Sequence, residues 1–330
     1  MKRRTFLQGL AASAVVANMR ADTTIPRRVY KGDVKLSLIA LGGIVVVGME
    51  QAEANRTVAE AFDRGVNYFD VAPSYFDGEA ERKLGPALQP YRNRSFLACK
   101  TMARDAAGAR KDLEQSLDRL KTGHFDLYQF HAVSKTEDVD EILAPGGAAE
   151  TFVKARQEGK VRFLGASVHD VKAAIALMDR FTLDSVMFPL NFVLVEEGNF
   201  GPQILEKAKA KGVTRIALKA LAYTSWPNKQ HDKWHKCWYQ PIENPELAEK
   251  AFRFTLSEDV TAAIPPGEEV LFKMAMGFAS RFRPLDSKER QALLAQSVEA
   301  VTDVAWAVLS ADADGQVHAQ QPTEHWLPDD

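Results

Sequence analysis

Four side chains that can transfer protons or stabilise charge stand at or just beyond the ends of three successive apolar runs. Asp70 closes the first run, and Tyr75 follows it five positions later, beyond a proline. Lys100 closes the second run and His131 closes the third. Short apolar runs rich in β-branched and aromatic residues predict buried strands. Because the carboxyl ends of parallel strands meet at one face of a sheet or barrel, we expect these four side chains to converge.

Together the four residues suit proton transfer at a carbonyl or alcohol oxygen. A tyrosine in water titrates near ~10 and donates poorly at neutral pH, but a neighbouring ammonium stabilises its phenolate. We therefore expect Lys100, held in place by Asp70, to lower the pKa of Tyr75 so that it can give or take a proton. His131 can donate a hydrogen bond to a substrate oxygen on which negative charge develops. Since no side chain supplies hydride, this chemistry requires a nicotinamide cofactor.

Each of these residues also has an ordinary structural explanation. A lysine after a strand is usually a solvated rim residue, and a lone histidine is usually a satisfied core residue. Asp126, at the start of the third run, is an alternative functional residue. These separate explanations do not predict that Asp, Lys and His close consecutive runs, so the shared position favours one site.

Apolar runs and helix-spaced segments alternate regularly along the chain. The predicted strands span 36–41, 66–69, 95–99, 126–130, 161–166, 185–188, 213–218 and 260–264, and the predicted helices span 51–64, 78–88, 107–120, 147–157, 171–180, 203–211, 245–256 and 268–279. Eight strand–helix units over about 250 residues predict an α/β fold, a closed (β/α)8 TIM barrel. An open doubly wound sheet is the alternative, but the sequence after the first strand lacks Gly-x-Gly-x-x-Gly.

The remaining segments lie at the two ends of the predicted barrel. A turn signal at 31–33 predicts an N-terminal β-hairpin. Segment 287–309 reads as one or two additional helices, followed by a polar tail. The predicted domains are therefore a barrel over 27–282 and C-terminal helices with a tail over 283–330.

The composition is that of a soluble globular protein. The chain has 330 residues, of which 46% are hydrophobic and 26% charged, and its formal net charge is −2. This balance creates no field that would favour nucleic acid or an anionic membrane. Two cysteines, Cys99 and Cys237, cannot form a disulfide framework.

Residues 1–21 read as a targeting segment rather than as part of the fold. A basic start precedes an apolar run over 6–17 that is too short to span a bilayer. The pattern Arg3-Arg4-x-Phe-Leu resembles a twin-arginine export signal, so we expect a periplasmic or otherwise exported protein without stable membrane anchoring after signal removal. The alternative is an N-terminal arm of a cytoplasmic protein.

Several stretches of the chain resemble the aldo-keto reductase family. They are GVNYFDVAPSY at 65–75 with GEAE at 78–81, CKT at 99–101, SLDRL at 116–120 with DLYQFH at 126–131, and GKVRFLGAS at 159–167. The resemblance covers roughly 27–282 in order and spacing. It implies a (β/α)8 barrel, NADPH-linked carbonyl reduction, and a catalytic set of Asp70, Lys100, His131 and Tyr75, with Tyr75 as proton donor.

The resemblance also implies cofactor contacts, some of them through altered residues. The predicted cofactor-binding residues are Gly43, Asp70, Ser167, Asn191, Lys219, Pro266 and Gly267. Val168 replaces the asparagine that the family places after its serine, and Asn191 is the substitute for a glutamine. Leu218 or Lys219 stands where the family has an aromatic ring against nicotinamide.

Segment 264–269 leaves the choice between NADP and NAD open. Backbone amides near Gly267 and the following helix N-terminus can accept phosphate. Glu268 and Glu269 would repel the 2′-phosphate of NADP, whereas one of them could bond the ribose 2′-hydroxyl of NAD. The family resemblance implies NADP, with NAD as the alternative.

The loop over 222–244 is predicted to wall the substrate pocket, since barrel specificity resides in such loops. Its notable residues are Trp226, Trp234, Trp238, Tyr239, His231, His235 and Cys237. We assign substrate contacts to Trp226 and Trp234. The two histidines and the cysteine could bind a metal on a helix, but a fourth ligand is not evident and no metal is predicted.

The leading prediction is a nicotinamide-dependent oxidoreductase that reduces a small aldehyde or ketone to an alcohol, or catalyses the reverse. One alternative is a catalytically weak barrel that binds a nucleotide or a partner protein, because several cofactor residues are altered. Another is an isomerase or dehydratase with tightly held nicotinamide, because an exported protein meets no free nicotinamide pool.

Overall fold

The computed structural model describes residues 24–296 apart from 197, 225 and 227–232. The predicted export signal, the tail and the segment from 297 onward lie outside the described residues, as does His231. The strands are β1 (Arg27–Lys31), β2 (Val34–Ser37), β3 (Ala40–Gly42), β4 (Tyr68–Asp70), β5 (Phe96–Thr101), β6 (Phe125–Val133), β7 (Val161–Val168), β8 (Ser185–Pro189), β9 (Thr214–Leu218), β10 (Ala222–Thr224), β11 (Gln240–Pro241) and β12 (Ala262–Ile264). The helices are α2 (Gln51–Asp63), α3 (Glu79–Leu88), α4 (Ala106–Arg119), α5 (Thr136–Leu143), α6 (Ala148–Gln157), α7 (Val171–Arg180), α8 (Phe192–Glu196), α9 (Pro202–Ala210), α10 (Pro245–Ser257), α11 (Glu269–Ser280) and α12 (Ser287–Leu294), with 3-10 turns η1 (Gly43–Val46) and η2 (Gln89–Arg94).

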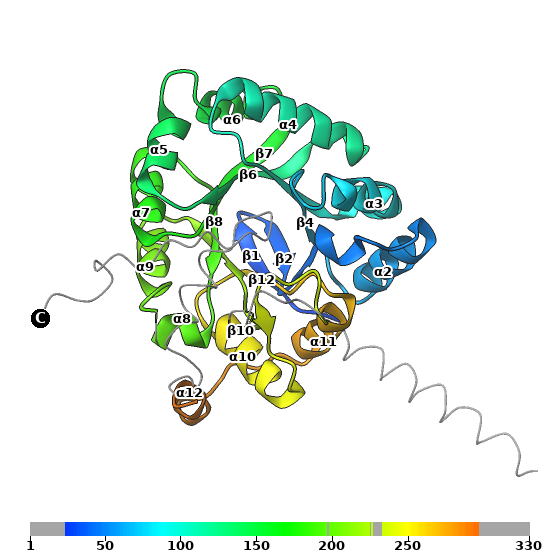
Figure 1. Cartoon of the computed structure of the whole chain (residues 1–330), viewed down its shortest axis with the longest axis vertical. Coiled ribbons are helices and arrows are strands. Elements are labelled where there is room, and N and C mark those ends of the chain that lie inside the picture. Colours follow the sequence, from blue (N-terminus) through cyan, green and yellow to red (C-terminus); the bar gives the residue numbers. More distant parts are fainter. Residues whose placement is uncertain (1–23, 197, 225, 227–232, 297–330) are drawn as a thin grey trace, which may run out of the picture.

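Eight parallel strands form the barrel, in the order β3-β4-β5-β6-β7-β8-β9-β12. A parallel bridge between Ile39 and Ala263 joins the two edge strands and closes the ring. Figure 1 looks down this ring and shows helices around its outside. The predicted (β/α)8 barrel is confirmed, and the open doubly wound sheet is excluded.

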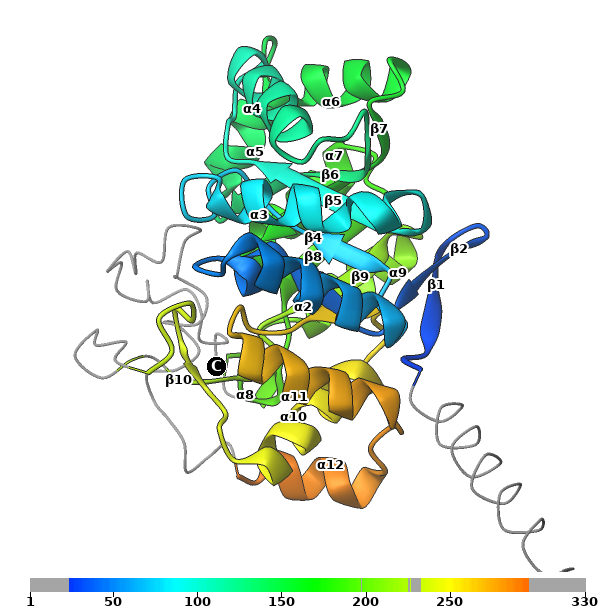
Figure 2. The ribbon, with the colours of Figure 1, turned by 90° about the vertical axis from the view of Figure 1, so that its right-hand side faces the viewer.

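The predicted N-terminal hairpin covers one end of the barrel. β1 and β2 pair in antiparallel fashion, and Figure 2 shows them at the end opposite β10. The ring of Tyr30 contacts those of Phe96 and Phe163, with centroids 5.0 and 5.2 Å away. Its hydroxyl donates to Ser185 Oγ at 3.0 Å. The hairpin therefore plugs the amino-terminal end of the barrel and leaves the carboxyl end for the loops.

Side chains of the barrel strands alternate between the interior and the helix layer, as the period of two requires. On β4, Tyr68 belongs to the interior apolar cluster and Asp70 lies two residues further on the same face. The same alternation places Lys100 on β5 and His131 on β6 beyond interior apolar residues of their own strands. The interior is therefore apolar at depth and polar where the strands end.

Three features of the fold depart from the predicted element order. α5 and α8 were not predicted, and neither was the short antiparallel pair of β10 and β11. α5 and α8 are one or two turns long, too short to give a clear helical period. The predicted first strand, 36–41, is divided between the hairpin strand β2 and the barrel strand β3.

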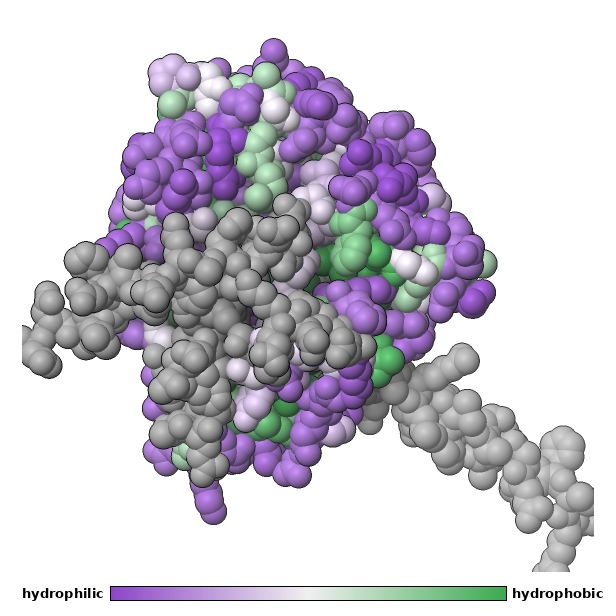
Figure 3. Space-filling view, in the orientation of Figure 1, coloured by the Kyte–Doolittle hydropathy of each residue, from purple (hydrophilic) through white to green (hydrophobic). Residues whose placement is uncertain are grey.

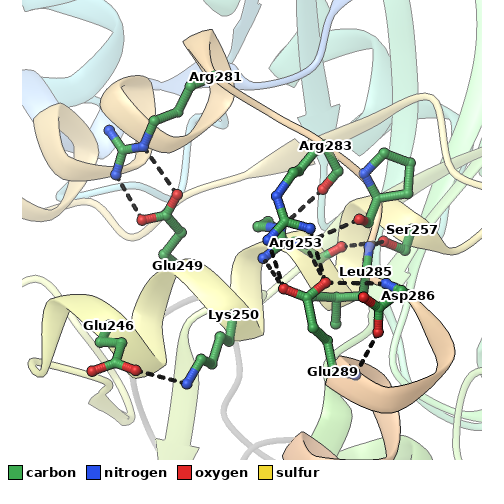
Figure 4. A network of polar contacts seen from close by, with 11 residues as sticks. Glu246, Glu249, Lys250, Arg253, Ser257, Arg281, Arg283, Leu285, Asp286 and Glu289 are labelled. Carbon is green, nitrogen blue, oxygen red and sulfur yellow. Dashed lines mark hydrogen bonds and ion pairs between the residues drawn. The ribbon is translucent and has the colours of Figure 1, made fainter.

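α12 confirms part of the helical prediction for 287–309 and is held by an ion-pair network with α10 (Figure 4). The guanidinium of Arg253, only 6% exposed, donates to both carboxylate oxygens of Glu289 at 2.7 and 3.0 Å. It also donates to the carbonyls of Arg283 and Pro284. A buried guanidinium with paired donors fixes this helix against the outside of the barrel.

Candidate active site

The predicted catalytic side chains lie together at the carboxyl end of the barrel. Lys100 Nζ forms an ion pair with Asp70 and lies 3.3 Å from the hydroxyl oxygen of Tyr75. Asp70 and Lys100 are 2% and 1% exposed, so their charges are shielded from water. The rings of Tyr75 and His131 meet edge to face, with centroids 5.6 Å apart. The convergence expected from the three strand ends is therefore present.

The loop between β4 and α3 positions Tyr75 through a strained path. The Tyr75 amide donates to the carbonyl of Ala72 at 3.1 Å, closing a tight turn. The following Phe76 and Asp77 both have left-handed backbone, with φ of 51° and 50°. Such conformations cost free energy in residues other than glycine and are concentrated at functional sites. The Lys100 ammonium donates to the carbonyl of Val71 at 3.2 Å and so fixes the start of this loop.

Burial has the largest effect on the pKa of Tyr75 and raises it, while Lys100 opposes the rise and Asp70 adds to it. The lowered pKa expected from the sequence is wrong, because desolvation of the phenolate outweighs the single ammonium. Burial also pulls the pKa of Lys100 down, but Asp70 and Tyr75 pull it up, and the net result lies above the ordinary value. At neutral pH the site therefore holds a neutral phenol beside an ammonium–carboxylate pair.

His131 is a neutral imidazole at physiological pH. Burial, and then the charge of Lys100, lowers its pKa well below the ordinary value. Arg104 donates to the carbonyls of His131 and Ala132 at 2.9 and 3.0 Å, and Ala132 has a left-handed φ of 51°. Arg104 therefore holds the strained backbone next to the imidazole. A neutral imidazole in a dry site can donate one hydrogen bond without carrying a charge of its own.

A pocket lies over these residues. Asp70, Tyr75 and His131 line it, and so do the predicted cofactor residues Ser167, Lys219, Pro266 and Gly267. Gly267 is tightly placed, because a Cβ at this position would lie 2.3 Å from Ile44 Cγ2. The loops after β12 and β3 therefore approach each other as closely as glycine permits.

The two predicted substrate residues do not line this pocket. Neither Trp226 nor Trp234 belongs to the pocket lining. The indole of Trp226 donates to a backbone carbonyl at 2.8 Å, and that of Trp234 donates to a carboxylate at 2.7 Å. Trp238 from the same loop lines the pocket instead, with its ring centroid 6.4 Å from that of Tyr75.

Two predicted cofactor residues also lie outside the lining. The Asn191 amide donates to the carbonyl of Lys219 at 3.0 Å and accepts from a backbone amide of α8 at 2.9 Å, so both ends of the amide are engaged. Gly43 is a packing residue, because a Cβ there would lie 2.6 Å from Val71 Cγ2. Gly42 lines the pocket in its place.

Sequence reasoning missed several residues that the pocket contains. His169 lines the pocket two positions beyond Ser167, at the end of the same strand. Residues two apart on a strand share a face, so this spacing could have indicated His169 from the sequence. Lys236 lines it from the loop over 233–239, where no strand or helix period could have indicated its direction. Gln129 lies outside the lining but donates to Asp70, and it has the same spacing relation to His131.

The chemistry of the lining fits a nicotinamide nucleotide. Ser167 offers a hydroxyl, while Lys219 and Lys236 line the same pocket with amino groups that can pair with a phosphate when charged. Burial lowers the pKa of Lys219 to about 7, and a bound phosphate would favour its charged form. Pro266 and Gly267 lead from the pocket to the amino terminus of α11, whose free amides suit an anion.

The start of α11 is acidic. Glu268 accepts from the backbone amide of Lys236 at 2.7 Å. Glu269 accepts from Thr57 Oγ1 at 3.1 Å and pairs with Lys273 at 2.8 Å. Lys273, the cation nearest in sequence to this helix start, is therefore already paired with a carboxylate.

The closed (β/α)8 barrel carries its pocket at the carboxyl ends of the strands, where barrel enzymes place their active sites. The chain belongs to the aldo/keto reductase family, whose sequence model matches residues 39–262. It is therefore an NAD(P)H-dependent carbonyl oxidoreductase that acts on small molecules. Family membership favours this function over a non-catalytic binding barrel.

Two relatives resemble the chain in sequence, and one solved structure resembles it in fold. The chain is 24% identical over 297 residues to the "uncharacterized oxidoreductase YqkF" of Bacillus subtilis. This match covers 81% of this chain and 94% of that protein. It is 33% identical over 143 residues to methylglyoxal reductase YeaE of Escherichia coli, covering 42% and 48%. The holo form of aldo-keto reductase AKR11C1 from Bacillus halodurans superposes with a TM-score of 0.64 at 23% identity, covering 85% of this chain and 98% of that one. Among the described residues, no helix is long and apolar enough to cross a membrane.

Proposed function

We propose that the chain reduces an aldehyde or ketone to the alcohol, or catalyses the reverse, with Tyr75 as the proton donor. The observation that carries this proposal is the 3.3 Å approach of Lys100 Nζ to the Tyr75 hydroxyl beside the buried partner Asp70. When bound, the nicotinamide supplies hydride to the carbonyl carbon. The protein supplies the proton and the electrostatics.

The proton moves from Tyr75 to the substrate oxygen as negative charge develops there. The oxygen of an alkoxide is far more basic than a phenolate, so a neutral phenol with a raised pKa is still a competent donor. Lys100 stabilises the phenolate that remains, and Asp70 keeps the ammonium in place. Neutral His131 donates a hydrogen bond to the same substrate oxygen.

We further propose that NADH binds at least as tightly as NADPH, although the family resemblance implies NADP. The acidic start of α11 supports this, since Glu268 and Glu269 would face the extra phosphate and Lys273 is already paired.

These proposals are tested by nucleotide titration and turnover. We expect the purified chain to bind NADH and to oxidise it when an aldehyde or ketone such as methylglyoxal is added. We expect Glu269→Gln to improve NADPH binding relative to NADH by about threefold, because one repulsive charge is removed. Glu249→Gln, on the outer face of α10, is the matched control. No binding of either nucleotide would overturn the function, and tighter binding of NADPH, unchanged in Glu269→Gln, would overturn the cofactor preference.

We also propose that residues 1–21 act as a twin-arginine export signal, on the support of the Arg3-Arg4 pattern and the short apolar run that follows it. Replacing both arginines by lysine keeps the charge but removes the recognised pair. We expect the doubly substituted chain to accumulate in the cytoplasm and the unaltered chain to reach the periplasm, as measured by cell fractionation. Lys2→Gln is the control that keeps the pair. Equal distribution of all three chains would exclude the proposal.

A further inference from the structure

Gln129 contacts the carboxylate at the centre of the proposed catalytic set. It lies on β6 with no exposed surface, two residues before His131. Its Nε2 donates to Asp70 Oδ2 at 3.1 Å, while the other oxygen, Oδ1, is paired with Lys100. The hydroxyl of Tyr68 also donates to Oδ2, at 3.3 Å. Each oxygen of the carboxylate therefore has its own donors, and rotating the carboxylate would break them.

The orientation of the Gln129 amide follows from the chemistry of its partner. An ionised carboxylate can only accept hydrogen bonds, so the amide nitrogen must face Asp70. The amide oxygen Oε1 is then buried without a hydrogen-bond partner among the described residues. A buried unsatisfied acceptor is unfavourable, and an apolar side chain of the same length would avoid it. The cost of this unsatisfied oxygen offsets the stability gained from the bond to Asp70, so fold stability alone is a weak reason for a glutamine at this position.

We propose that Gln129 is a positioning residue, which fixes the Asp70 carboxylate so that Lys100 stays directed at the Tyr75 hydroxyl. This proposal rests on the proposed function, because it assigns Gln129 a role through that proton donor. Gln129 has no hydrogen bond to Tyr75 and does not itself line the pocket, so it acts through Asp70. Without its amide, the carboxylate keeps one donor on Oδ2 and gains freedom to rotate, and the ammonium loses its fixed direction.

Gln129→Met tests this role, because it keeps the length of the side chain and removes the donor. We expect kcat for carbonyl reduction to fall about tenfold, the loss of one charge-assisted hydrogen bond. We expect KM for the carbonyl and Kd for the nucleotide to stay within about twofold. We expect Tm to change little, because the lost bond to Asp70 is offset by removal of the buried unsatisfied Oε1. Gln129→Glu restores a donor only while its own carboxyl is protonated. Its kcat should therefore approach the wild-type value towards low pH and fall behind it towards high pH.

Ser185→Ala is the matched control, since Ser185 is a fully buried polar residue inside the barrel that bonds Tyr30 rather than Asp70. It is expected to lower Tm without lowering kcat per folded molecule. The proposal is overturned if Gln129→Met keeps its kcat, or if its loss of activity only follows a loss of folded protein. It is also overturned if Ser185→Ala loses as much kcat. The Tyr75→Phe variant tests the proposed function separately. If that variant keeps wild-type carbonyl reduction, the proposed function is wrong whatever the Gln129 variants show.

Discussion

Tyr75→Phe is expected to lower kcat for carbonyl reduction by about 10²- to 10⁴-fold, the usual contribution of a positioned proton donor. The substitution removes a single oxygen, which lies 3.3 Å from Lys100 Nζ, and leaves the ring packed edge to face on His131. The substrate oxygen then has to take its proton from water in a site that largely excludes it. Steady-state oxidation of the reduced nucleotide at saturating carbonyl measures the loss.

The same variant should bind nucleotide almost normally, because in the proposed mechanism the phenol contacts the reacting oxygen rather than the phosphates. Fluorescence quenching should give a Kd within about twofold of wild type. Tyr91→Phe is the matched control, since Tyr91 stacks on Phe62 at 4.5 Å, away from the pocket, and its loss of a hydroxyl should leave turnover unchanged. Full turnover in Tyr75→Phe would show that another group donates the proton.

The order of strands and helices was predictable because a buried parallel strand is an apolar run with an abrupt polar end. Asp70, Lys100 and His131 each mark such an end, and the period of two places all three on the inward face. That rule also pointed to Gln129, two residues before His131. It was overlooked because a glutamine inside an apolar run carries no charge and has no obvious chemistry.

The predicted site residues that do not line the pocket lie mostly on loops. Trp226, Trp234 and Trp238 share one irregular segment, and no periodicity tells which ring turns inward. Asn191 was assigned to the cofactor by its type, but its amide is engaged by the backbone. The pKa of Tyr75 was misjudged for a different reason. The sequence names the neighbouring charge but does not show how completely the phenol is removed from water.

Lys100→Met should damage both stability and catalysis, because it leaves Asp70 as an uncompensated charge in a site where the side chain is 3% exposed. Breaking a buried pair by removing one partner costs about 3–5 kcal/mol. In the folded wild type the pKa of Lys100 lies above its ordinary value. The contribution of the pair to stability is therefore fully present at neutral pH and is lost only as the pH rises through that folded value. Thermal or urea unfolding at pH 7 measures the difference.

Catalysis should fall for a separate reason, which a double variant can isolate. Without the ammonium the phenolate is less stable, so the pKa of Tyr75 rises further. Carbonyl reduction should lose at least about 10²-fold, and the increase of alcohol oxidation with pH should move to higher pH. Lys100→Met combined with Asp70→Asn removes both charges, so most of the stability should return while activity stays low. If the double variant regained turnover, the ion pair would serve only the fold, and the charge beside Tyr75 would have no part in moving its proton.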